Sequence, residues 1–309
     1  MTNSILDDFK NAWNKPNNAP AQLIIINVVV FLFLGVILVF STIGGAKGFF
    51  DAIHAQFSIP PILSDFLTRP WTLVTYGFAH SLSDIFHILF NMLFLFYFGR
   101  LIVEYMGNNK VISIYVLGVI SGALLYLLAY NTVPFYIERA PAVNGMVGAS
   151  AAVNAIMVAA AVLTPNYTFY LLLIGPVKIK YIAGFFVVIS FLSSIGGNAG
   201  GNIAHLGGAA IGWIYVRQLQ KGTDLGAWVI QFMEFVQSFF KKPSNIKVTH
   251  RSEKAKTSRS RPSKRASSAT SSKETSQEQI DAILDKISQS GYESLTKEEK
   301  QQLFNASKK

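Results

Sequence analysis

Long runs of apolar residues are the feature that most limits what this chain can fold into. A helix needs about 20 apolar residues to cross a hydrocarbon layer about 30 Å thick. Five segments reach or approach that length: Ala21–Ile43, Ile85–Val103, Val111–Tyr130, Gly148–Leu163 and Ile203–Leu219. A sixth, Tyr181–Ser194, is shorter, and extending it backward through Phe169–Leu173 meets a helix-breaking Gly-Pro pair. The sequence therefore predicts an all-α membrane protein, a bundle of six transmembrane helices.

The low share of charged residues also indicates a membrane protein. Only 14% of the 309 residues are charged and 51% are hydrophobic, whereas soluble domains carry about 25% charged residues. The chain has no cysteine, which excludes disulfides, thiolate catalysis and cysteine-ligated metal sites. We therefore expect no metal and no cofactor.

Cations at the ends of the apolar runs predict the orientation of the bundle. With both termini in the cytoplasm, eight cations lie at cytoplasmic helix ends: Lys10, Lys15, Arg100, Lys110, Lys178, Lys180, Arg217 and Lys221. The opposite side holds three, Lys47, Arg69 and Arg139. This asymmetry agrees with the positive-inside rule and with an even number of spans. Because the N-terminus shows neither a cleaved signal peptide nor an Arg-rich transit peptide, we expect a multi-pass protein of the bacterial cytoplasmic membrane.

Composition divides the chain into five regions. They are a cytoplasmic N-terminal segment (1–20), a six-span core (21–220), an interfacial amphipathic helix (221–240), a disordered basic linker (241–276) and a short helical module (277–309). Thr296 and Glu299 fit a capping box in the last region. Residues 241–309 hold 16 Lys/Arg against 8 Asp/Glu, but they lack interleaved aromatic residues, so we expect no nucleic-acid binding. A cytoplasmic partner for this tail is open.

Polar side chains inside the apolar runs point to a functional site, because such groups are costly in a membrane. His87 and Asn91 lie four residues apart on one face of the second run. Ser150 opens the fourth run, and His205 lies near the start of the sixth. Each alone has an ordinary explanation, such as an N-cap or a bond between helices. However, all of them lie near the start of helices that run from the external side toward the cytoplasm. We therefore expect them at one depth in the membrane.

Small residues at every fourth position accompany two of these polar groups. They are Ala151, Ala155 and Ala159 after Ser150, and Ala204, Gly208 and Gly212 around His205. Such spacing allows two helix backbones to approach closely. Close approach of the fourth and sixth spans would bring a hydroxyl within about 2.6–3.2 Å of an imidazole, the distance at which a base activates a serine.

At these residues the chain resembles the rhomboid intramembrane serine proteases of bacterial type. The resemblance is carried by His87-Ile-Leu-Phe-Asn91-Met with Phe98-Gly99 and Glu104, by Gly148-Ala-Ser150-Ala, and by Ala204-His205-Leu-Gly-Gly208. It covers roughly Ala21–Leu219. The terminal helical pair resembles short C-terminal modules found on some bacterial relatives.

The resemblance implies a role for each matching residue. Ser150 would be the nucleophile and His205 the general base, in a dyad without aspartate. The Ser150 backbone N–H, with the side chains of His87 and Asn91, would hold the oxyanion, and Gly148 would allow a tight backbone before the nucleophile. The substrates implied are transmembrane segments of other proteins in the lipid bilayer.

Two positions depart from the family pattern. Ala151 stands where the family usually has glycine after the nucleophile, so a methyl group could narrow the site. Trp71-Thr72 replaces a Trp-Arg pair in the first loop, which removes an ion pair often made there.

Two rival functions stay open at this point. A rhomboid-like scaffold would hold client helices without cutting them, and it would not need Ser150 and His205. A transporter with His87 and His205 in a proton path would show inverted repeats and buried carboxylates, and the sequence shows neither.

Overall fold

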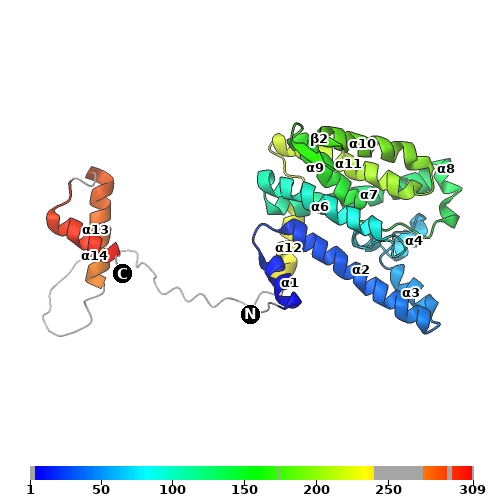
Figure 1. The fold of residues 1–309 in the computed structure, drawn as a ribbon, viewed down its shortest axis with the longest axis horizontal. Coiled ribbons are helices and arrows are strands. Elements are labelled where there is room, and N and C mark those ends of the chain that lie inside the picture. Colours follow the sequence, from blue (N-terminus) through cyan, green and yellow to red (C-terminus); the bar gives the residue numbers. More distant parts are fainter. Residues whose placement is uncertain (1–3, 173, 240–273, 291–293, 308–309) are drawn as a thin grey trace, which may run out of the picture. The chain divides into compact units, whose positions relative to one another are not determined.

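The computed structural model describes residues 4–172, 174–239, 274–290 and 294–307. The chain divides into two compact units, residues 1–243 and 244–309. The first unit is almost entirely helical, and its long helices run side by side (Figure 1).

Six helices form at the six predicted positions. They are α2 (Ala19–Ile43), α6 (Ile85–Met106), α7 (Asn108–Thr132), α9 (Ser150–Leu163), α10 (Ile179–Leu192) and α11 (Ala199–Gln220). In the described part of the chain, three of them, α2, α6 and α7, are long and apolar enough to cross a membrane by length and composition. Helices α9 and α10 are apolar but shorter. The count of six crossings therefore stays a prediction.

Helix α9 forms the centre of this unit, and it packs against α6, α7, α10 and α11. Every residue from Ala151 to Ala161 is buried. Small residues make this possible: a β-carbon on Gly208 would overlap the carbonyl of Ala151, and one on Gly212 would overlap the carbonyl of Ala155. The predicted close approach of the fourth and sixth helices is confirmed. Helix α2 lies at the edge of the bundle and packs on α6 and on the short helix that follows α2 (Figure 1).

Short helices complete the loops and ends of the unit. The loop before α6 holds α3 (Lys47–His54), α4 (Leu63–Thr68), α5 (Thr72–Thr75) and the 3-10 turn η1 (Tyr76–Phe78). The loop before α9 holds α8 (Pro134–Ile137) and η2 (Ala140–Ala142), and η3 (Ser193–Ile195) follows α10. Helices α1 (Ile5–Asn14) and α12 (Ala227–Ser238) flank the bundle in sequence. Helix α12 falls within the region predicted to be an amphipathic helix.

A β-hairpin joins α9 to α10, where the sequence suggests a backward extension of the sixth apolar segment through Phe169–Leu173, interrupted by Gly-Pro. Strand β1 (Thr168–Leu171) pairs antiparallel with β2 (Gly175–Lys178), with Phe169 opposite Val177. Gly175 has a φ of +89° and precedes a proline, so a helix cannot continue backward through this point. The aromatic and β-branched residues of β1 favour a strand. The expectation of a purely α-helical chain is therefore wrong for this segment.

The second unit holds α13 (Glu274–Ser290) and α14 (Lys297–Ser307). The Thr296 N–H donates to Glu299 Oε2 at 2.8 Å, and the Glu299 N–H donates to Thr296 Oγ1 at 3.3 Å. This confirms the predicted capping box. Lys286 Nζ lies 2.9 Å from Glu299 Oε1 and ties the two helices together. Nearly all of the predicted basic linker falls outside the described residues.

Candidate active site

Ser150 and His205 are in direct contact. Ser150 Oγ lies 2.8 Å from His205 Nε2, within hydrogen-bonding distance. Ser150 is the first residue of α9, and His205 lies in the second turn of α11. A helix start leaves backbone N–H groups unpaired and carries a partial positive charge. A hydroxyl at this position can therefore be activated by the imidazole while N–H groups face the reacting oxygen.

The backbone before Ser150 requires glycine. Gly148 has a φ of +141°, a conformation that side chains other than hydrogen rarely allow. A β-carbon there would lie 3.1 Å from Nε2 of the His87 ring and 3.4 Å from Ser150 Oγ. The Gly148 N–H donates to the Tyr76 carbonyl at 3.0 Å, which fixes this segment to the loop before α6. The structure therefore brings Gly148, His87 and Ser150 together.

A short pairing of two loops supports the same segment. Ile59 and Met146 exchange both backbone hydrogen bonds, at 3.0 and 2.9 Å. Gly145, with a φ of +94°, lies directly on Ser58. The loop between α2 and α6 thus holds the chain that leads into α9.

His87 and Asn91 lie on the first two turns of α6. Asp84 caps this helix, and its Oδ1 accepts from the Phe86 N–H at 3.0 Å and the His87 N–H at 3.3 Å. Asn91 Nδ2 donates to the His87 carbonyl at 2.7 Å. An amide has a second N–H, and Asn91 lines a cavity together with Ser150 and His205. The other four predicted site residues therefore lie around Ser150.

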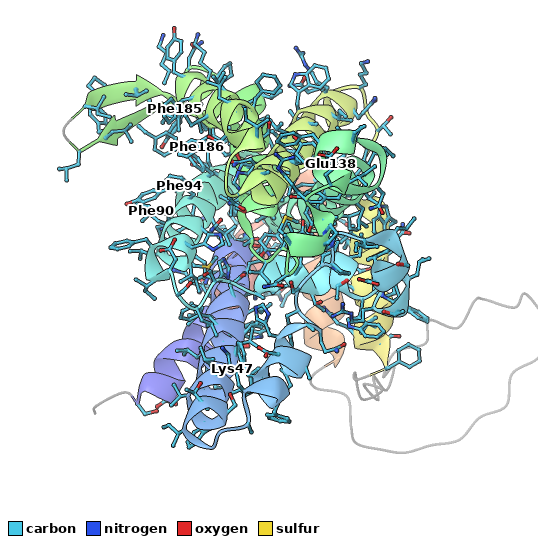
Figure 2. All side chains as sticks on the ribbon, turned by 90° about the vertical axis from the view of Figure 1, so that its right-hand side faces the viewer. Lys47, Phe90, Phe94, Glu138, Phe185 and Phe186 are labelled. Carbon is cyan, nitrogen blue, oxygen red and sulfur yellow. The ribbon has the colours of Figure 1, made fainter. Side chains whose placement is uncertain are left out.

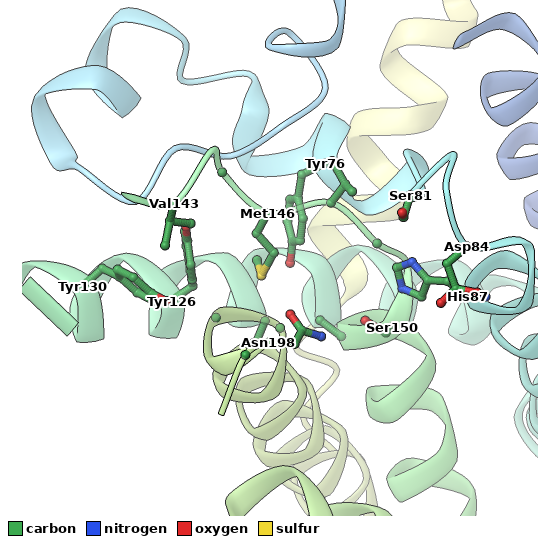
Figure 3. A pocket seen from close by; sticks show the side chains of 18 residues that line it. Tyr76, Ser81, Asp84, His87, Tyr126, Tyr130, Val143, Met146, Ser150 and Asn198 are labelled. Atoms are coloured by element: carbon green, nitrogen blue, oxygen red, sulfur yellow. Dashed lines mark hydrogen bonds between the residues drawn. The ribbon is translucent and has the colours of Figure 1, made fainter. Parts of the chain in front are cut away.

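Two cavities meet at Ser150. The first, of about 390 Å³, lies under the loops and is lined by His87, Gly148, Ser150 and Asn198 among other residues (Figure 3). The second, of about 350 Å³, lies between α6 and α10 and is lined by Asn91, Ser150 and His205. Ser150 is thus accessible from the loops and from the gap between two helices.

Aromatic side chains narrow this second opening. The rings of Phe94 on α6 and Phe186 on α10 meet edge to face, with centroids 5.3 Å apart, and both line the second cavity. Phe90 and Phe185 lie on the same two helices nearby (Figure 2). Phe185 is 62% exposed on the outer surface of α10.

His80 is a buried histidine that the sequence did not single out. Its ring is fully buried and lies edge to face against the His87 ring, with centroids 5.3 Å apart. Burial, together with neighbouring His87, lowers the pKa of His80 to about 3. His80 is therefore neutral at physiological pH, and the surroundings of the His87 ring gain no charge from it.

Ser190 and Asn154 are two further polar residues at the site that sequence reasoning missed. Ser190 Oγ lies 3.2 Å from His205 Nδ1. Asn154 Nδ2 donates to the Ser150 carbonyl at 2.9 Å, while its buried Oδ1 has no hydrogen-bond partner among the described atoms. Both are isolated polar residues in apolar runs, a signal that could have drawn attention to them. Their contacts depend on how the helices pack, and the spacing of residues along the sequence does not predict that packing.

The methyl group of Ala151 is accommodated by α7. A β-carbon on Gly122 would lie 2.5 Å from Ala151 Cβ. The extra methyl thus packs against a glycine on the neighbouring helix.

Thr72 is the second position that departs from the family pattern. Its side chain is fully buried, and its hydroxyl donates to the Arg69 carbonyl at 2.6 Å. An uncharged hydrogen bond therefore exists at this position.

Comparison with known proteins matches residues 67–221 to the rhomboid domain family, and residues 270–309 to a family described as being of unknown function (DUF6576). The chain is 35% identical over 162 residues to RHOMBOID-like protein 12, mitochondrial, of Arabidopsis thaliana, covering 50% of this chain and 48% of the relative. It is 28% identical over 168 residues to Rhomboid-like protein 16, chloroplastic, of the same plant, covering 50% of each. The chain spans about half the length of the curated relatives it matches.

Proposed function

Because this chain belongs to the rhomboid family, we propose that it is an intramembrane serine endopeptidase that cuts peptide bonds in or near transmembrane segments. The observation that carries the proposal is the 2.8 Å contact between Ser150 Oγ and His205 Nε2. The matched domain and the three apolar helices make the chain a multi-pass membrane protein. The relatives carry organellar names, so the bacterial cytoplasmic membrane stays a prediction, as does the cytoplasmic side of both termini.

The proposed chemistry is acyl transfer through Ser150. His205 Nε2 takes the proton of Ser150 Oγ as this oxygen bonds to the scissile carbonyl carbon. The negative carbonyl oxygen is held by the Ser150 backbone N–H, the His87 ring and the free N–H of Asn91, where each donor contributes roughly 3–4 kcal/mol in a water-excluded site. His205 then gives its proton to the leaving amine as the C–N bond breaks. Water, activated by the same imidazole, hydrolyses the ester.

The depth of the site fits hydrolysis below the membrane surface. Helix α9 has 14 residues, about 21 Å of helix, which is less than the hydrocarbon thickness of about 30 Å. Because neighbouring helices bury it, α9 does not need to reach either surface, and Ser150 at its first turn lies inside the bundle. The loop cavity supplies space for water. We propose on this basis that all six long helices belong to the membrane core.

A substrate helix must unwind before Ser150 can attack, because the peptide groups of a helix are bonded to each other. We therefore propose substrates that carry Gly, Pro or other helix-weakening residues near the cut. Helix α12 presents Trp228, Phe232 and Phe235 as exposed side chains, which supports its predicted place at the membrane interface.

Labelling with a fluorophosphonate probe tests the proposal. Purified wild-type chain is expected to bind the probe covalently, and Ser150→Ala and His205→Ala are expected to lose labelling. Cleavage of a single-span substrate should be lost in parallel. Labelling that is independent of both substitutions would refute the mechanism, and an inert wild type that still binds client helices would favour the scaffold function.

A further inference from the structure

Ser190, near the end of α10, contacts the ring nitrogen of His205 that faces away from Ser150. Ser190 Oγ lies 3.2 Å from His205 Nδ1, while Nε2 of the same ring lies 2.8 Å from Ser150 Oγ. Ser190 is only 2% exposed. The three side chains therefore form one hydrogen-bonded row across α9, α11 and α10.

We propose that Ser190 is a positioning residue that fixes the tautomer and the orientation of His205. This inference rests on the proposed protease function and deepens it. A neutral imidazole carries its proton on either Nδ1 or Nε2. Only the form protonated on Nδ1 leaves a lone pair on Nε2 for the proton of Ser150. An acceptor at Nδ1 selects this form.

A serine hydroxyl can serve as that acceptor. Serine carries two lone pairs beside its proton, and in helices it often donates the proton to the carbonyl of the preceding turn. Its lone pairs then remain for the His205 Nδ1–H. As His205 gains a second proton during the reaction, the same contact stabilises the imidazolium. Ser190 thus takes the place that a carboxylate has in a three-residue serine protease site.

An uncharged residue suits this place in the bundle. A buried carboxylate inside a membrane protein carries a large desolvation cost. In the described part of the chain, Asp84 is the only carboxylate that lines either cavity at Ser150, and it caps α6 by accepting from the His87 N–H. Among the described residues, Ser190 is the one side chain that hydrogen-bonds to His205 Nδ1.

Nitrogen-15 NMR of the histidine-labelled full chain in detergent micelles tests the tautomer directly. Two-bond nitrogen–proton couplings distinguish the two forms, and His205→Gln identifies the His205 signals. Wild type is expected to show His205 protonated on Nδ1, and Ser190→Ala is expected to shift the population toward the Nε2 form. An unchanged tautomer in Ser190→Ala would overturn the proposal.

Kinetics with a single-span fluorescent substrate give the second readout. Ser190→Ala is expected to lower kcat about two- to tenfold, as expected for one lost hydrogen bond, with KM nearly unchanged. Ser190→Thr, which keeps the hydroxyl, should recover most of kcat. The matched control is Ser194→Ala, which removes a hydroxyl bonded to the Phe191 carbonyl at 2.7 Å and should match wild type. A rise in KM alone, or equal loss in Ser194→Ala, would refute positioning.

The two proposals can fail separately. If Ser150→Ala cleaves as well as wild type, the protease function is wrong, whereas the NMR measurement needs no substrate and still reports whether Ser190 fixes the ring. If Ser150→Ala is inactive but Ser190→Ala keeps both kcat and the wild-type tautomer, the protease stands and the role of Ser190 is wrong.

Discussion

The carbonyl of Ala151 occupies the space that a β-carbon on Gly208 would fill. This contact lies one residue after Ser150 and three residues after His205. It therefore sets the distance between the backbones of α9 and α11 at the level of the hydroxyl and the imidazole. The packing of two small residues and the geometry of the candidate dyad are one structural feature.

Replacing Gly208 with alanine is expected to separate the two helices. The added methyl overlaps a backbone carbonyl that has no rotamer with which to move away, and such overpacking costs about 1–3 kcal/mol. We expect a lower unfolding temperature in micelles and loss of fluorophosphonate labelling. Gly184→Ala on α10 is the control, because a β-carbon there meets nothing within 4 Å, and it should be neutral or slightly stabilising. Equal labelling of both variants would contradict this account of the packing.

Gly148→Ala tests the backbone before the nucleophile. Alanine at a φ of +141° is strained by about 1–3 kcal/mol, and its methyl would press on the His87 ring, one of the proposed oxyanion donors. We expect kcat to fall at least tenfold while the fold persists, as followed by circular dichroism. Gly48→Ala on α3, where a β-carbon meets nothing within 4 Å, should keep wild-type kcat. A fully active Gly148→Ala would show that this conformation is not required.

The sequence predicted the helices and the cluster of site residues because both follow from local patterns. Apolar runs locate the helices. Small residues at every fourth position after Ser150 and around His205 predict the close contact of the two helices that carry these residues. The contact of Ser190 with His205 depends on how α10 packs against α11, which no local pattern encodes. The contact of Ala151 with Gly122 likewise involves a third helix, so the effect of that methyl was not predictable.

The contact between Phe94 and Phe186 predicts a barrier to membrane substrates. An edge-to-face pair contributes about 0.5–1.5 kcal/mol, so Phe94→Ala is expected to raise the open population about two- to tenfold. Cleavage of a single-span substrate should rise accordingly, while labelling by a small fluorophosphonate, which can enter from the loop cavity, should change little. Phe191→Ala, at an exposed ring on the same helix α10, should leave both rates as in wild type. A parallel change in both readouts would argue against a gap between α6 and α10 as the entry route.

Asp224 predicts a loss of stability in acid. Its Oδ1 accepts from the Tyr215 hydroxyl at 2.9 Å and the Gly226 N–H at 3.0 Å, and its Oδ2 pairs with Lys110. Burial alone would raise the pKa of Asp224, but the hydrogen bonds from Lys110, Gly226 and Tyr215 outweigh it, so the pKa lies below its usual value. A carboxylate with a lowered pKa stabilises the fold above its unfolded pKa of about 3.9, and this contribution is lost as pH falls through the lower, folded value. Unfolding temperatures between pH 7 and pH 3 should therefore decline less in Asp224→Asn than in wild type, from a lower starting point at pH 7. Asp65→Asn, at an exposed carboxylate, should follow wild type, and an unaltered pH slope in Asp224→Asn would contradict the assignment.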